Sequence, residues 1–399
     1  MKLLKIQARG LKLFNDEISI GFYAKQRVSM DKNEMVTNVF SNIYINNVIS
    51  MAGTNASGKT TTLKVISFVL QMLKNRPIND IDYKEILEGM ESGSEIIFDV
   101  YFVAKDNELK KLSTVIKSKG SNLEAKEEVS SKYYISSEKI WTKSYSSVRS
   151  KNDLFDFSNA KLEEERKDDE LFLLDDVSII VAFNKKQENQ LLAIDTMDWT
   201  NFNGIRVLAN YPRELVRFLD PSIEYIKYEK INVNGQGKME IKLKFYNKKE
   251  LVLYSPKELN ELLSSGTIKG INIFMTAMFA LQKGGYIIID ELENHFNKEI
   301  VSTLIRLFID AETNKSGAVL IFTTHYVELL DIFDRNDSVF VLNNKNGIAI
   351  ENLSDLIKRN DIKKSELFQS GYLENTTVSY DSYISLKRAI VKRLIDSEV

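Results

Sequence analysis

Cysteine is absent from the 399 residues of this chain. The absence excludes disulfides, thiolate metal sites and cysteine nucleophiles. It also fits a protein of the cytoplasm, which is the location that we expect. Proline occurs only 4 times, so long proline-rich linkers are not expected. Histidine occurs only 2 times, so each histidine can be judged as a candidate on its own.

Long apolar runs are missing as well. No run reaches the roughly 18–20 apolar residues that a membrane-spanning helix needs. The residues after Met1 read as a half-polar strand and not as a signal peptide, so we expect no membrane contact. The net charge is −2 and the isoelectric point about 6.0. The whole chain is therefore no general polyanion binder, although local basic patches remain compatible with these values.

A phosphate-binding loop is the most informative motif in the sequence. Residues 53–60 read Gly-Thr-Asn-Ala-Ser-Gly-Lys-Thr and fit the pattern G-x-x-x-x-G-K-[ST]. An apolar run (48–51) precedes the loop and a helical pattern (60–74) follows it, so loop N–H groups and a helix N-terminus can hold a triphosphate. The alternative is a glycine-rich turn that serves packing alone. The expected nucleotide contacts are Gly53, Thr54, Asn55, Ala56, Ser57, Gly58, Lys59, Thr60 and Thr61.

Several loop residues have separate expected roles. The amine of Lys59 would reach the β- and γ-phosphates, and the hydroxyl of Thr60 would bind Mg²⁺. Gly53 and Gly58 would let the backbone turn around the phosphates without a Cβ atom in the way.

A second motif is an apolar strand pattern that ends in two acids. Residues 286–291 read Tyr-Ile-Ile-Ile-Asp-Glu, and buried acids are costly unless they meet a cation or carry out chemistry. Asp290 would hold Mg²⁺ through a water, and Glu291 would orient and deprotonate the attacking water. The alternative is that both carboxylates only cap the following segment.

His325 follows another apolar run (318–322) and two threonines. A lone histidine after a strand can be a structural hydrogen-bonding residue. Functional groups in open α/β sheets gather at the carboxyl ends of the strands. We therefore favour His325 as a catalytic residue that senses the γ-phosphate.

The segment 263–267 reads Leu-Ser-Ser-Gly-Thr and starts a helical pattern that extends to Leu281. This pattern is apolar almost all round, which predicts a buried helix. A helix N-terminus with serine and glycine can bind an anion, so Ser264, Ser265 and Gly266 are candidate nucleotide contacts. Taken alone, the segment is better explained as an ordinary N-cap by one of the two serines.

The chain changes in character between its two ordered parts. Residues 105–211 are rich in polar and charged stretches, such as 162–170, and such stretches are usually solvated faces or loops. We predict an insertion there that forms a lid or a partner-docking region. The flanking regions, 1–104 with the phosphate loop and 212–399 with the other motifs, would form the two lobes of the core.

Along the chain, the phosphate loop is followed by the insertion, the segment 263–267, the acidic strand and His325. Motifs in this order resemble those of ABC-type ATPases, which include transporter motor domains and the heads of SMC and RecF proteins. Transporters carry LSGGQ as their signature, whereas this chain reads LSSGT. That form resembles the P-loop ATPases of the OLD and abortive-infection (AbiLi- or RloA-like AAA) type of bacterial phage defence. Further similar segments are 290–296 (DELENHF), 371–376 (GYLENT) and 173–179 (LLDDVSI). The resemblance covers most of the chain.

The resemblance implies an α/β fold, with a mostly parallel central sheet, an antiparallel β subdomain and an inserted α+β lid. It implies an enzyme that hydrolyses ATP to ADP and phosphate with Mg²⁺. It further implies a homodimer or higher homo-oligomer in which Ser265 and Gly266 of one subunit close on ATP bound by another. Glu293 and Asn294 would lie in the segment that links the two sites. Nucleotide binding would close the dimer and hydrolysis would reopen it.

The setting implied by the resemblance is phage defence by abortive infection. The chain would be a nucleotide-gated sensor or regulator of a separate, co-encoded effector, a nuclease or a toxin. Its trigger would be a nucleic acid or a phage protein. The region 340–399 shows no acid cluster typical of a nuclease, and its basic segment 386–393 is either a docking surface or a plain solvated face.

Three other functions stay open. A RecF-like ATPase of DNA repair or recombination would need a basic stripe for duplex DNA. A transporter motor is disfavoured by LSSGT and by the polar insertion. A scaffold that binds ATP without turnover is the non-catalytic alternative.

Two parts of the ABC-type pattern have no clear counterpart in the sequence. Asn184, Gln187 and Gln190 are the candidates for the glutamine loop that contacts Mg²⁺, and none has a convincing context. Phe14 is a candidate for stacking on adenine only because it follows the first strand. We expect His295 at the surface or at an interface.

Overall fold

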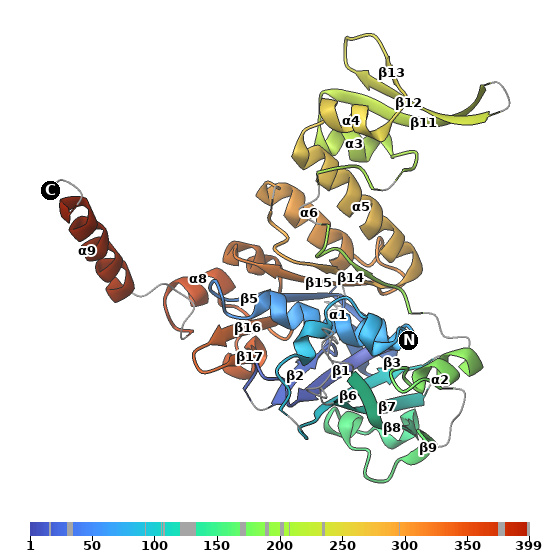
Figure 1. Ribbon diagram of the computed structural model, residues 1–399, viewed down its shortest axis with the longest axis vertical. Helices are drawn as coiled ribbons and strands as arrows, with labels where there is room; N and C mark the ends of the chain where they lie inside the picture. Colours follow the sequence, from blue (N-terminus) through green and yellow to red (C-terminus); the bar gives the residue numbers. More distant parts are fainter. Residues whose placement is uncertain are drawn as a thin grey trace, which may run out of the picture.

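A mixed six-stranded sheet lies at the centre of the computed structural model, in the strand order β10-β14-β15-β5-β16-β17 (Figure 1). Neighbouring strands from β10 to β16 run parallel, and β17 is antiparallel to β16. The strands are β5 (Val48–Ala52), β10 (Ala193–Asp195), β14 (Tyr286–Ile289), β15 (Val319–Thr324), β16 (Val339–Asn344) and β17 (Ile348–Asn352).

The structure describes the chain except for a set of short segments. These are residues 16, 30–34, 92, 105, 107, 120–132, 168–172, 188–190, 200–202, 207, 234–235, 295, 374–379 and 397–399.

The middle strands of the central sheet are covered on both faces. All residues of β5, β14 and β15 are buried, as continuous apolar runs predict for parallel strands. Along β14 the side chains alternate between two cores: Tyr286 and Ile288 belong to one, Ile287 and Ile289 to the other. Because these strands are parallel, the loops after β5, β14 and β15 meet at one edge of the sheet.

A second, antiparallel sheet packs against one face of the first, with α1 (Lys59–Leu73) in the core that both share. Its strand order is β2-β1-β6-β7-β8-β9. The strands β7 to β9 come from the region predicted as an insertion, and they extend the sheet formed by the chain before it. The bounds are β1 (Lys2–Arg9), β2 (Glu17–Gly21), β6 (Ile96–Val103), β7 (Glu108–Ser118), β8 (Tyr133–Ser144) and β9 (Lys161–Glu165).

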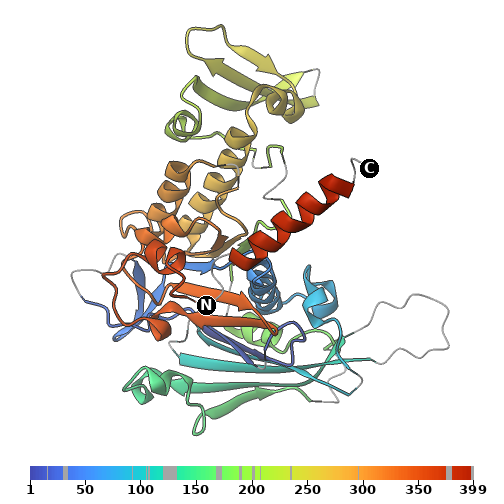
Figure 2. The ribbon, with the colours of Figure 1, turned by 90° about the vertical axis from the view of Figure 1, so that its left-hand side faces the viewer.

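The helices α5 (Ser265–Lys283) and α6 (Lys298–Ile309) cover the opposite face of the central sheet. α5 has 19 residues and is therefore about 28 Å long. It rises away from the sheet in Figures 1 and 2. The prediction of burial all round is wrong for part of α5, since Met278 and Phe279 are 42% and 47% exposed.

A small lobe surrounds the N-terminal end of α5, at the top of Figures 1 and 2. It is built on a three-stranded antiparallel sheet with its own hydrophobic core, to which α5 contributes Ile268 and Ile271. The elements are α3 (Arg213–Leu219), β11 (Ile223–Val233), β12 (Gln236–Phe245), β13 (Leu251–Leu253) and α4 (Pro256–Leu262).

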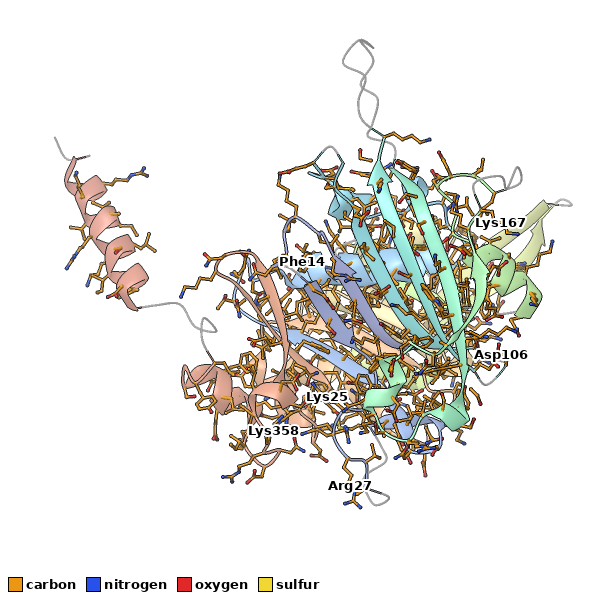
Figure 3. All side chains as sticks on the ribbon, turned by 90° about the horizontal axis from the view of Figure 1, so that it is seen from below. Phe14, Lys25, Arg27, Asp106, Lys167 and Lys358 are labelled. Atoms are coloured by element: carbon orange, nitrogen blue, oxygen red, sulfur yellow. The ribbon has the colours of Figure 1, made fainter. Side chains whose placement is uncertain are left out.

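The remaining elements lie at the periphery. α9 stands apart from the rest of the molecule in Figures 1 and 3. None of the helices in the described part of the chain has the length and hydropathy required to span a lipid bilayer. The peripheral elements are β3 (Val36–Phe40), β4 (Ile43–Asn46), α2 (Ile180–Gln187), α7 (Leu353–Leu356), α8 (Lys364–Gln369) and α9 (Tyr380–Asp396).

Candidate active site

The loop between β5 and α1 has the tight backbone that its glycines predict. Gly58 has a φ of 97° and caps the N-terminus of α1, a conformation that glycine adopts without steric cost. A Cβ atom on Gly53 would lie 2.4 Å from the carbonyl oxygen of Leu342. Asn344, at the end of β16, donates a hydrogen bond to the carbonyl oxygen of Ala56 at 3.1 Å. The loop is therefore shaped by its neighbour strand as well as by its own sequence.

Several groups of the loop are suited to binding an anion. The hydroxyl oxygen of Ser57 is buried and has no hydrogen-bond partner within the described residues, which is unusual unless a ligand supplies one. The amine of Lys59 donates to the carbonyl oxygens of Gly53 and Thr54, both at 2.9 Å. Burial lowers the pKa of Lys59, and the charges of nearby acids oppose this shift. The first turn of α1 carries no acidic side chain that would repel a phosphate.

The loop after β14 brings two acids to the same edge. The hydroxyl of Thr60 donates to Oδ2 of Asp290 at 2.8 Å, and the hydroxyl of Thr323, from β15, donates to Oδ1. A hydroxyl and a carboxylate side by side are the oxygen ligands that Mg²⁺ accepts while keeping several waters. The donor set formed by Thr60 and Asp290 therefore fits Mg²⁺ bound together with phosphate oxygens.

Glu291 lies next to His325. Its Oε1 atom is 3.4 Å from Nε2 of His325, and its Oε2 atom accepts a hydrogen bond from the side chain of Asn294. The side chains of Glu291 and His325 are 42% and 31% exposed, so both are accessible to a ligand. Glu291 has a φ of 47°, and backbone strain of this kind clusters at functional sites.

An open cavity of about 690 Å³ connects these groups, a volume typical of sites for small molecules. Its remaining wall comes from two segments far from the loop in sequence. Lys12 and Leu13 follow β1, and the turn between β16 and β17 contributes Asn346 and Gly347. The full lining is Lys12, Leu13, Asn55, Ala56, Ser57, Gly58, Lys59, Thr60, Thr61, Glu291, His325, Asn344, Asn346, Gly347 and Ile348.

Phe14 does not fit the proposed role of stacking on adenine. It is only 8% exposed, belongs to the hydrophobic core and pairs with Ile348 through a β-bridge. Figure 3 shows it against the strands. Leu13 is 58% exposed and lines the cavity, so it offers the apolar surface that was predicted at the next residue.

The signature segment lies outside this cavity. Ser264 is the N-cap of α5 and accepts a hydrogen bond from the backbone N–H of Thr267 at 3.1 Å, as the plain N-cap interpretation predicts. Ser265 and Gly266 form the first turn of α5, at the end of the helix that lies in the small lobe. The structure of one chain therefore brings the phosphate loop, the acids and His325 together, but not the signature.

The candidates for the glutamine loop lie elsewhere. Asn184 is buried and donates to the carbonyl oxygen of Leu73, and Gln187 bonds Asp106. Neither lines the cavity, and Gln190 and His295 lie outside the described residues.

The cavity residues after β16 were missed from the sequence, although a signal was present. The apolar run 339–342 is followed by Asn-Asn-Lys-Asn-Gly and a second short apolar run. This pattern is typical of a hairpin. Pairing of β16 with β5 then places the turn beside the phosphate loop.

Residues 48–331 match the family described as "AAA domain, putative AbiEii toxin, Type IV TA system". The match covers more than half of the chain and includes the phosphate loop, both acids and His325. The chain belongs to this AAA-domain family. Its α/β fold with a mixed sheet is that of a P-loop ATPase, and the family supports ATP as the ligand of the cavity. A comparison with curated proteins found no match.

Proposed function

We propose that this AAA-domain protein is an Mg²⁺-dependent ATPase of the ABC type. One observation carries the proposal: the phosphate loop, Glu291 and His325 line one cavity, with Thr60 bonded to Asp290 and Glu291 beside His325. A phosphate cradle alone would serve many nucleotide-binding proteins. A carboxylate and an imidazole at its open side are the groups that hydrolysis requires.

Each group has a defined role in this proposal. Lys59 exchanges its two carbonyl partners for the β- and γ-phosphates. Thr60 and Asp290 would hold Mg²⁺, which would supply positive charge beside the phosphates. Glu291 accepts a proton from the attacking water, and His325 contacts the γ-phosphate and orients the carboxylate of Glu291. The partly exposed carboxylate of Glu291 can reach a water in the cavity without a change in the fold.

The signature supports a composite site formed by two copies. Ser265 and Gly266 lie outside the cavity of their own chain, at the far end of α5. The cavity is open, so a second copy can approach it and place its α5 N-terminus against the γ-phosphate. ATP then links the two copies, and hydrolysis releases them.

The biological role that we propose is phage defence in the cytoplasm. The LSSGT signature and the family description, which names a putative toxin of a type IV toxin–antitoxin system, support it. The nucleotide state would control a separate effector of the nuclease or toxin class in response to a nucleic acid or a phage protein. The division into an N-terminal lobe (1–104), an inserted docking region (105–211) and a C-terminal lobe (212–399) belongs to the same proposal.

Two substitutions separate ATP binding from hydrolysis. Glu291→Gln keeps the shape of the side chain but removes the base, so ATP affinity should stay within about twofold while turnover falls by about 10²–10⁴-fold. Lys59→Ala removes the phosphate-binding cation and should abolish tight ATP binding. Calorimetric titration and phosphate release measure the two effects.

The matched control is Lys64→Ala on the same helix. Lys64 pairs with Glu85 at 2.8 Å and does not line the cavity, so its loss should leave ATP binding intact. Hydrolysis at the wild-type rate by Glu291→Gln would exclude Glu291 as the base. Unchanged ATP affinity of Lys59→Ala would contradict the phosphate site itself.

A further inference from the structure

We propose that Glu293 is a positioning residue for ATP hydrolysis, which fixes His325 through its backbone. The inference rests on the proposed function and deepens it. Glu293 follows Glu291 by two residues, and its side chain points back to β15, where Oε1 accepts a hydrogen bond from the backbone N–H of His325. It does not line the cavity, so it would act on the reaction only through His325.

Burial of the Glu293 carboxylate does not stabilise the folded protein. Only 7% of the residue is exposed, and Oε2 has no hydrogen-bond partner within the described residues. A buried carboxylate that is only partly satisfied lowers the free energy of unfolding. A neutral or apolar side chain would suit the core better, so the carboxylate points to a role in the site.

The carboxylate of Glu293 gives the backbone N–H of His325 an acceptor that the sheet does not provide. β15 ends at Thr324, so the N–H of His325 lies beyond the hydrogen bonds between strands. The next N–H, of Tyr326, bonds the hydroxyl of Thr324. Without Glu293, the N–H of His325 would lose the acceptor that it has in this turn. Glu293 therefore determines where the backbone of His325 leaves the sheet.

Hydrogen bonds join the turn after β14 and the turn after β15, with donors on both sides. The N–H groups of Glu291 and Leu292 donate to the hydroxyl and the carbonyl oxygen of Thr323, at 2.7 and 3.0 Å. Glu293 completes this connection from the acid turn back to the histidine turn. The imidazole of His325 and the carboxylate of Glu291, 3.4 Å apart, thus depend on one set of bonds for their relative position.

Loss of the Glu293 bond should loosen this position without opening the phosphate loop. A misplacement of about 1 Å at a reacting group can cost about 10²-fold in rate. ATP binding should persist, because Lys59 and the loop N–H groups do not depend on Glu293 for their contacts. We therefore expect kcat to fall with little change in ATP affinity.

Two variants of Glu293 separate the effect of side-chain length from the effect of charge. Glu293→Gln removes the charge but keeps an oxygen that can accept the His325 N–H, so kcat should stay within about threefold of wild type. Glu293→Asp keeps the charge but is one methylene too short, so kcat should fall by about 10-fold or more. Both variants should bind ATP within about twofold of the wild-type affinity.

A double-mutant cycle with His325→Ala tests the route of action. If Glu293 acts through His325, then Glu293→Asp should cause no further loss of kcat in the His325→Ala background. Glu138→Gln is the matched control, because Glu138 is a buried carboxylate of β8 that accepts the backbone N–H of Ile179 at 2.7 Å. It should leave kcat at the wild-type value.

Three results would overturn the inference. Glu293→Asp with wild-type kcat would show that the length of the side chain is irrelevant. Glu293→Gln as impaired as Glu293→Asp would show that an acceptor oxygen for the His325 N–H is not sufficient and that the charge is required as well. Additive losses with His325→Ala would show an action independent of His325. An inactive wild-type protein would overturn the proposed function and this inference together, whereas active wild type with insensitive Glu293 variants overturns the inference alone.

Discussion

Thr323 occupies a central position at the residue scale. Its hydroxyl accepts the N–H of Glu291 and donates to Oδ1 of Asp290, and the residue is completely buried. One hydroxyl therefore orients the proposed metal-binding carboxylate and the backbone of the proposed base. A threonine at a strand end gives no such indication in the sequence, because its partners come from the loop after β14.

Thr323→Val should impair both stability and catalysis. The substitution keeps the shape of the side chain but leaves the Asp290 carboxylate and the Glu291 N–H without this partner. The free energy of unfolding should fall by about 1–3 kcal/mol, and the Mg²⁺ concentration for half-maximal turnover should rise. Denaturant unfolding and magnesium titrations of ATPase activity measure the two effects.

Thr276→Val is the control for this experiment. Thr276 lies on α5, is 8% exposed, and its hydroxyl bonds the carbonyl oxygen of Asn272 within the helix. Its loss removes a buried hydroxyl that bonds neither acid and should leave the magnesium dependence unchanged. An equal rise in the magnesium requirement of both variants would contradict the role of Thr323.

The cavity residues that belong to short motifs could be predicted from the sequence. Those that line the other side of the cavity, such as Leu13 and Asn346, could not. The pattern around Lys59 and the acids after β14 carry their chemistry within a few residues. Leu13 and Asn346 reach the cavity only because β1 and the turn after β16 pack beside the phosphate loop. No local pattern encodes that contact, and for the same reason the sequence did not show that Phe14 is buried in the core while Leu13 lines the cavity.

At the scale of elements, the carboxylate of Glu138 connects β8 to the start of α2. It accepts hydrogen bonds from the hydroxyls of Thr114 and Ser178 and from the N–H of Ile179. Burial raises the pKa of Glu138, against the opposing effect of these hydrogen bonds. The folded protein therefore holds a proton on Glu138 at pH values where the unfolded chain has lost it.

The pH dependence of stability should reflect this shift. The stabilising contribution is complete below the ordinary pKa of 4.5 and is lost as the pH rises through the raised pKa of the folded state. Denaturant unfolding of wild type should therefore show a free energy that falls over this range. Glu138→Gln cannot titrate and should give a flatter profile. The same slope in both proteins would contradict the assignment.

Elements with one simple periodicity could be predicted from the sequence. The runs that became β5, β14 and β15 are apolar throughout, because both faces of each strand are covered. β7 and β8 alternate buried and half-buried residues, and their charged outer faces made the region resemble a solvated insertion. Which sheet they extend depends on pairing with β6, a long-range contact that charge patterns do not report.

At the scale of the whole molecule, the two ends of α5 serve different cores. Its C-terminal part packs on the central sheet, and its first turns belong to the small lobe that carries the signature. One chain therefore holds the cavity and, in a separate lobe, a signature that does not line it. We propose that ATP is hydrolysed where the phosphate loop of one copy meets the signature of another.

Mixing two inactive variants tests this claim most directly. Lys59→Ala disables the phosphate loop and Ser265→Arg blocks the signature, so each alone should lack ATPase activity. Random dimers of the mixture contain one intact composite site in each mixed pair, and phosphate release should return to about a quarter of the wild-type rate. A mixture of Lys59→Ala with Glu291→Gln, which affect the same side of the site, should stay inactive. No recovery in the first mixture, or full activity of Ser265→Arg alone, would contradict the account.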